Sequence, residues 1–188
     1  EGRLIFPRFH QLRAVERVVA DVEAKGPGGR YLIWHSAGSG KSNSIAWLAH
    51  RLSRLHGAAD KQVFDSVIVV TDRQVLDAQL QDTIYQFEHK QGVVQKIDED
   101  TRQLAQALAG GTPIVITTVQ KFPFITETLD KLRKENHPGI AIDTQDKQFA
   151  VIVDEAHSSQ SGENAMELKG VLNAHRIEEE AAQYVAEH

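Results

Sequence analysis

The sequence predicts an α/β fold in which a parallel sheet is covered by helices on both faces, a three-layer arrangement. Apolar, strand-like runs alternate with segments of helical periodicity along most of the 188 residues, a pattern typical of parallel sheets. A glycine-rich turn at residues 38–42 joins one such run to a helix, and the acidic pair Asp154 and Glu155 ends another. Both motifs follow strand-like runs, and α/β proteins bind their ligands at the carboxyl ends of strands.

The helices are predicted from apolar residues that recur every three or four positions. They cover residues 9–22, 41 to about 54, 76–87 and 100–109. Strong breakers at residues 25–29 end the first helix, and Gly110 with Gly111 ends the last.

The strands are predicted from short, continuous apolar runs, which suit strands that are buried on both faces. They cover residues 31–35, 67–70, 113–117 and 149–153, with a weaker run at 93–97. The stretch from about 122 to 147 is mixed and polar, and its pattern predicts no element. Residues 178–188 are acidic and poor in core residues, so we expect a frayed or disordered end. We interpret the chain as one domain, residues 1–177, cut from a longer protein.

The turn at residues 38–42 has the features of a phosphate-binding loop. Gly38 and Gly40 permit the positive φ angles of a tight turn, in which successive N–H groups and the helix N-terminus converge on an anion. Lys41 is expected to reach the β- and γ-phosphates of a nucleotide, and Ser42 is expected to hold magnesium.

One position departs from the usual pattern of such loops, because His35 stands where a glycine is expected. The core of the motif is intact and reads Gly38-Ser39-Gly40-Lys41-Ser42. The alternative is an ordinary glycine–serine loop that opens a helix. The strand and helix periodicities on either side favour the phosphate site.

The acidic pair ends a fully apolar run, where two carboxylates are costly unless they face a cation or a cleft. Asp154 suits a magnesium shell shared with Ser42, and Glu155 suits the base that orients or deprotonates an attacking water. The alternative is a solvated strand end with a helix-capping acid, which Lys41 upstream disfavours. Together the two motifs predict binding and hydrolysis of a nucleoside triphosphate with magnesium.

The composition is that of an ordinary globular domain, with 41% hydrophobic and 25% charged residues, and fits a cytoplasmic enzyme. The lack of cysteine excludes a disulfide framework and a thiolate metal site. No apolar run approaches the roughly 20 residues of a membrane span, so no membrane partner is expected. The net charge of −5 does not indicate nucleic acid, so any DNA contact must come from a local patch.

Five blocks of sequence, in this order, resemble the motor (restriction) subunits of type I restriction–modification enzymes, which are superfamily-two helicase-like DNA translocases. The blocks are residues 6–11, 34–42, 70–77, 117–122 and 153–162. The resemblance runs from about residue 3 to 177. It implies the first RecA-like lobe of a P-loop, DEAH-box type motor that hydrolyses ATP with Mg²⁺.

The resemblance also implies roles for single residues. Gln11 matches a glutamine that reads the adenine edge, which suits an amide with both a donor and an acceptor, although periodicity alone places Gln11 on the solvent face of its helix. His157 matches a histidine that couples hydrolysis to movement. Other matches are to motifs that contact the DNA backbone, with plain strand-end polarity as an equal alternative: Arg73, Thr117, Thr118, Gln120 and Lys121.

The family carries a nuclease domain before this segment and a second motor lobe after it, and its serine/threonine-rich motif after the acidic box is missing here. The resemblance implies duplex DNA, methyltransferase subunits and specificity subunits as partners of the full-length protein. We therefore interpret the chain as a nucleotide-binding lobe rather than a working motor. Two alternatives stay open: another superfamily-two enzyme, such as a repair or RNA helicase, and a non-hydrolysing nucleotide sensor or assembly module, against which Glu155 argues.

Overall fold

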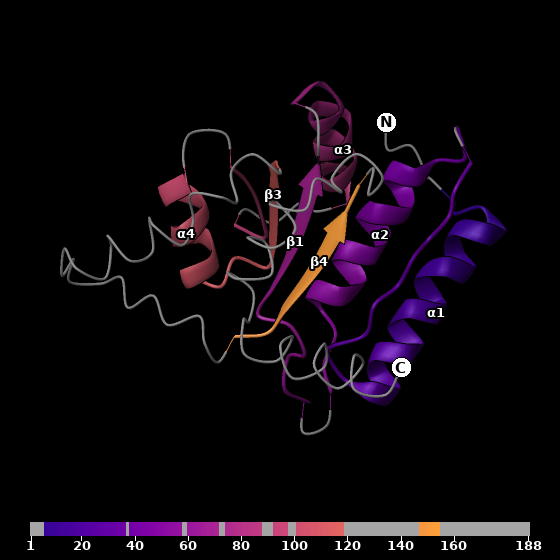
Figure 1. Cartoon of the computed structure of the whole chain (residues 1–188), viewed down its shortest axis with the longest axis horizontal. Coiled ribbons are helices and arrows are strands. Elements are labelled where there is room, and N and C mark those ends of the chain that lie inside the picture. Colours follow the sequence, from indigo (N-terminus) through magenta and orange to yellow (C-terminus); the bar gives the residue numbers. More distant parts are fainter. Residues whose placement is uncertain are drawn as a thin grey trace, which may run out of the picture.

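Helices and strands alternate along the chain (Figure 1). The structure is a computed structural model that describes residues 6–36, 38–57, 60–71, 74–87, 92–97, 101–118 and 147–154. The helices are α1 (Phe9–Lys25), α2 (Lys41–Ser53), α3 (Gln74–Gln86) and α4 (Thr101–Ala109), and the strands are β1 (Ser66–Thr71), β2 (Val94–Lys96), β3 (Ile114–Thr118) and β4 (Phe149–Val153). Each of them matches an element predicted from the sequence. No helix among the described residues has the length and apolarity needed to cross a membrane.

Four strands form one sheet in the order β2-β3-β1-β4. All three pairings between these strands are parallel. β1 lies between β3 and β4, with Val70 opposite Thr117 on one side and Val153 on the other. The carboxyl ends of β1, β3 and β4 therefore lie at the same edge of the sheet, and Asp154 follows β4 at that edge.

Alternate residues of β1 face two different helical layers, as the period of two in a strand requires. Val67 and Val69 belong to a core shared with α1, α2 and α3, whereas Ile68 and Val70 pack in a second core with residues of α4. α1 packs on α2, and α4 lies on the opposite side of the sheet (Figure 1). The predicted three-layer α/β arrangement, with helices on both faces, is confirmed.

The predicted strand at residues 31–35 is wrong, because this run forms no strand of the described sheet. The segment instead runs back along α1: the Tyr31 hydroxyl donates to Asp21 at 2.8 Å, and Trp34 and Ala14 line the same hollow. Leu32 and Trp34 are 82% and 90% exposed. A buried strand needs a hydrogen-bonded neighbour. Among the described strands, β4 is an edge strand that pairs with β1 alone, so residues 31–35 do not pair with its other edge. Because the segment packs against α1 on one side only, its other side, with Leu32 and Trp34, is exposed to solvent.

Two leucines test this placement. Leu80→Ala is expected to lower the free energy of unfolding by about 2–5 kcal/mol, because Leu80 is 1% exposed and its loss leaves a cavity. Leu32→Ala is the matched control and is expected to change stability by less than about 0.5 kcal/mol. Urea unfolding of both variants beside the parent chain measures the two effects. A loss at Leu32 as large as that at Leu80 would place residues 31–35 in the core.

Candidate nucleotide-binding site

The glycine-rich loop leads directly into α2. Gly38 and Gly40 have φ angles of 72° and 84°, in the left-handed region that glycine adopts without strain. Gly40 is the N-cap of α2, and no side chain makes a capping hydrogen bond there. The first N–H groups of a helix lack partners within the helix, so this end of α2 offers donors and a positive dipole end to an anion.

Lys41 of the loop is in contact with Asp154 of the acidic motif. The Nζ atom of Lys41 lies 3.4 Å from Oδ1 of Asp154. The backbone N–H of Asp154 donates to the carbonyl of Val70 at 2.9 Å, which holds Asp154 at the carboxyl edge of the sheet. The structure thus brings together two residues that lie far apart in the sequence.

Asp154 presents a mostly buried carboxylate beside Lys41. The residue is 9% exposed, and its Oδ1 accepts no hydrogen bond from the described residues. A buried carboxylate is costly without positive charge nearby, and carboxylate oxygens are the ligands that Mg²⁺ prefers. The donor set that Asp154 offers together with the Ser42 hydroxyl therefore fits magnesium, with Lys41 as the neutralising charge in this structure.

Gln11 contacts the loop although it belongs to α1. Its Nε2 donates to the carbonyl oxygens of Ser39 and Gly40, both at 2.9 Å, and its Oε1 accepts from the backbone N–H of Arg8 at 2.8 Å. The residue is 2% exposed. Helical periodicity placed Gln11 in solvent, and the structure buries it because the first turn of α1 lies against the loop.

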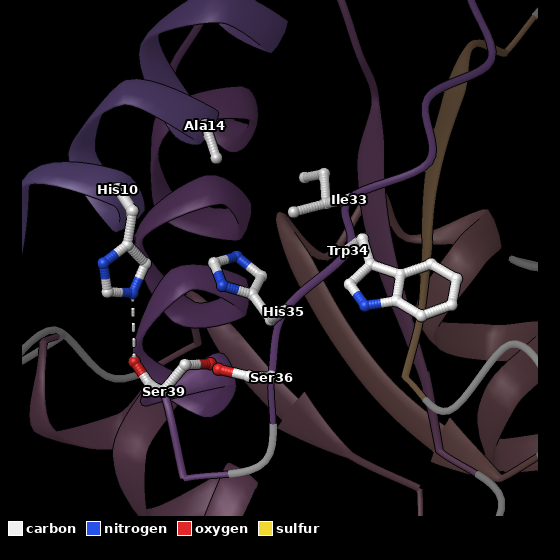
Figure 2. A pocket seen from close by; sticks show the side chains of 7 residues that line it. All are labelled: His10, Ala14, Ile33, Trp34, His35, Ser36 and Ser39. Carbon is white, nitrogen blue, oxygen red and sulfur yellow. Dashed lines mark hydrogen bonds between the residues drawn. The ribbon is translucent and has the colours of Figure 1, made fainter.

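Two histidines to which the sequence analysis gave no function lie beside the loop (Figure 2). The rings of His10 and His35 have centroids 5.5 Å apart, and Nε2 of His10 lies 3.3 Å from the carbonyl oxygen of Ser39. Burial lowers the pKa of His35, and the positive charges of His10 and Lys41 lower it further. A neutral His35 is compatible with the cationic Lys41 nearby. In the sequence, the one sign of this pair is His35, which stands where phosphate-binding loops usually have a glycine.

The two histidines line a hollow of about 280 Å³ between α1 and the segment that precedes the loop (Figure 2). The other residues that line it are Ala14, Ile33, Trp34, Ser36 and Ser39. Trp34 is mostly exposed, so the hollow is open to water at one end.

The residues expected to contact DNA are only partly described. Thr117 and Thr118 end β3 at the same edge as Asp154, but they are 1% and 5% exposed. Buried hydroxyls there are placed to pack within the sheet rather than to present donors at the surface. Other predicted site residues and the acidic tail lie outside the described residues: Arg73, Gln120, Lys121, Glu155, His157 and residues 178–188.

Comparison with known proteins identifies relatives of this chain. Residues 10–177 match the family model of the SWI2/SNF2 ATPase. The C-terminal part of a putative type I restriction enzyme MpnIIP endonuclease from Mycoplasma pneumoniae is 28% identical over 172 residues, which cover 86% of this chain and 76% of that protein. The type I restriction enzyme HindI endonuclease subunit from Haemophilus influenzae is 33% identical over 165 residues, or 82% of this chain and 14% of that protein.

A putative type I restriction enzyme MjaIXP endonuclease subunit from Methanocaldococcus jannaschii is 28% identical over 167 residues, or 86% of this chain. This chain spans 14% of that protein's length. The family match takes in the contact of His10 with Ser39 and that of Lys41 with Asp154. The contact of Lys41 with Asp154 joins the glycine-rich loop to the acidic motif in the folded chain. The chain belongs to the SWI2/SNF2 ATPase family, because the family model matches most of the sequence, and this contact agrees with the assignment.

Proposed function

We propose that this chain is the ATP-binding lobe of the DNA-translocating motor in a type I restriction endonuclease. The contact between Lys41 and Asp154 carries the proposal, because it joins a phosphate-binding lysine to a cation-binding carboxylate at one point. The named relatives, which are endonuclease subunits of type I restriction enzymes, support the choice of motor.

ATP binding at this site is an exchange of partners. The N–H groups at the start of α2 donate hydrogen bonds to the phosphate oxygens. Lys41 leaves Asp154 and contacts the β- and γ-phosphates. Asp154, released from the ammonium, and the Ser42 hydroxyl would then hold Mg²⁺. When bound, the ion neutralises charge on the phosphates.

Hydrolysis requires two further groups. Glu155 follows Asp154 directly, so the edge of the sheet that positions Asp154 is expected to place Glu155 near the γ-phosphate as the base for water. The second group is an arginine supplied by a second motor lobe, a kind of residue that contributes about 10³–10⁵ in rate in related phosphoryl-transfer enzymes.

In the whole protein we expect duplex DNA as the track, methyltransferase and specificity subunits as partners, and a cytoplasmic location. Arg73, Gln120 and Lys121 are the proposed contacts to the DNA backbone, since cations and amides bind phosphates without reading sequence. The burial of Thr117 and Thr118 makes these threonines weaker candidates for that contact. His157 is the proposed link between hydrolysis and movement.

Lys41→Ala is expected to weaken binding of Mg-ATP to the chain by roughly tenfold or more. The variant removes the hydrogen bond that Lys41 is expected to donate to the phosphates, and a hydrogen bond to a charged group contributes about 1.5–3 kcal/mol. Isothermal titration calorimetry measures the affinity. Lys25→Ala, which removes an exposed lysine of α1, is the control. Equal affinities for Lys41→Ala and the parent chain would rule out the loop as the phosphate site.

Glu155→Gln in the full-length enzyme is expected to keep ATP binding and to lose turnover, because it removes the base but keeps the shape of the side chain. Asp154→Asn is expected to weaken magnesium-dependent binding as well. ATP hydrolysis and nucleotide binding are measured on the same preparations. A normal rate of hydrolysis by Glu155→Gln would show that another group acts as the base.

The isolated chain of residues 1–188 is expected to have negligible ATPase activity that duplex DNA does not stimulate. One lobe positions only one side of the γ-phosphate, and a net charge of −5 gives little non-specific affinity for DNA at physiological salt. Phosphate release, with and without duplex DNA, measures the activity, with Glu155→Gln as the background control. Brisk DNA-stimulated turnover above that background would refute the interpretation of this chain as an incomplete motor.

A further inference from the structure

Thr71 is the last residue of β1 and lies at the carboxyl edge of the sheet. It is 2% exposed, and its hydroxyl has no hydrogen-bond partner among the described residues. Buried hydroxyls in native proteins are normally hydrogen-bonded, because leaving one unpaired costs free energy. The acceptor that lies nearest to this hydroxyl therefore indicates what Thr71 does.

The strand register places Thr71 beside Asp154. Val70 is opposite Val153 in the parallel pairing of β1 with β4, and the N–H of Asp154 donates to the carbonyl of Val70 at 2.9 Å. The next residues along the two strands, Thr71 and Asp154, are therefore neighbours. Adjacent strands lie about 4.8 Å apart, so side chains of such neighbours on the same face can reach one another.

The side chains of Thr71 and Asp154 face the same helical layer. Val69 of β1 belongs to the core shared with α2, and Ile152 of β4 packs against that core. Because residues two apart in a strand lie on the same face, Thr71 and Asp154 also face this layer. The contact of Asp154 with Lys41, the first residue of α2, agrees with that orientation.

Asp154 offers the acceptor that Thr71 lacks. Its Oδ1 is buried and accepts no hydrogen bond within the described part of the chain. The neighbour of Thr71 on its other side is Thr118 of β3. Hydrogen bonds to an ionised group are roughly twice as strong as those between neutral groups, so the carboxylate is a better acceptor for Thr71 than the hydroxyl of Thr118.

We propose that Thr71 is a positioning residue for Asp154, to whose carboxylate its hydroxyl donates a hydrogen bond when Mg-ATP is bound. The inference rests on the proposed function of the site, in which Lys41 leaves Asp154 for the phosphates. The hydroxyl then holds one oxygen of the carboxylate and leaves the other oxygen for the ion. Hydrogen bonds of this kind orient metal ligands, and losing one typically lowers metal affinity about 10–100-fold.

Thr71→Val tests the proposal, because it removes the hydroxyl but keeps the size and branching of the side chain. Calorimetry measures the affinity of the chain for ATP in magnesium and in EDTA, and the ratio gives the gain due to magnesium. We expect Thr71→Val to lower this gain by about tenfold and to leave the affinity in EDTA unchanged. Thr71→Ser keeps the hydroxyl and is expected to retain most of the gain. A full gain in Thr71→Val would overturn the proposal.

Stability without nucleotide distinguishes this role from a purely structural one. The hydroxyl of Thr71 has no described partner in the free chain, so Thr71→Val is expected to unfold at the same urea concentration as the parent, or a higher one. A lower midpoint would assign Thr71 to the packing of the sheet and overturn the proposal. Thr71→Ala replaces Thr71→Val if the latter does not fold.

Ser66→Ala is the matched control. Ser66 begins β1 at the opposite edge of the sheet, is 0% exposed, and its hydroxyl likewise has no partner among the described residues. This variant is expected to keep the full gain from magnesium. A loss in Ser66→Ala as large as that in Thr71→Val would show that the effect does not depend on the position beside Asp154, which would also overturn the proposal.

Lys41→Ala separates failure of this inference from failure of the proposed function. If the loop binds phosphate, Lys41→Ala loses affinity for ATP both in magnesium and in EDTA. If Lys41→Ala binds ATP as the parent does in both conditions, the phosphate site itself is wrong, and the role of Thr71 falls with it. If Lys41→Ala loses affinity and Thr71→Val keeps the full gain from magnesium, the site stands and Thr71 does not position Asp154.

Discussion

Parallel strand pairing is the constraint on which the site depends. Because β3, β1 and β4 run in the same direction, their carboxyl ends meet at one edge, and the register of β4 on β1 sets the position of Asp154. The N–H of Asp154 extends that register by bonding to Val70. Shifting β4 by one residue would turn Asp154 toward the opposite layer, so the acid of the site is positioned by backbone pairing rather than by its own side chain.

The second requirement is a loop that keeps its shape while empty of phosphate. Left-handed glycines allow the turn, but they also enlarge the range of conformations open to the unfolded and folded loop. α1 restricts that range from outside through Gln11, whose amide bonds two carbonyls of the loop and the start of its own helix. Preorganisation of this kind lowers the ordering cost of binding an anion. α1 and the loop therefore act as one unit of the site.

Charge at the site is balanced locally. The ammonium of Lys41 lies next to the carboxylate of Asp154, and this opposite charge limits the free-energy cost of burying the carboxylate. His35, with its pKa lowered by burial and by nearby positive charge, adds no cation to this balance when neutral. A triphosphate with its metal ion carries both signs of charge, so it can replace the contact between Lys41 and Asp154 without leaving either group unpaired.

The sequence by itself determined the order and kind of the elements, because their periodicities are local: the helical spacing of α2, the apolar runs of β1 and β3, and the glycines of the loop all act within a few residues. It also singled out Lys41 and Asp154 as candidate site residues, and the tertiary structure showed that they are in contact. Tertiary structure alone decided which apolar run enters the sheet. Residues 31–35 have the composition of a strand but lie along α1 and pair with no described strand, because composition alone does not supply the hydrogen-bonded neighbour that a strand needs. It also decided the burial of Gln11, because a polar residue at a solvent-facing position is buried only when another segment, distant in sequence, supplies its hydrogen-bond partners.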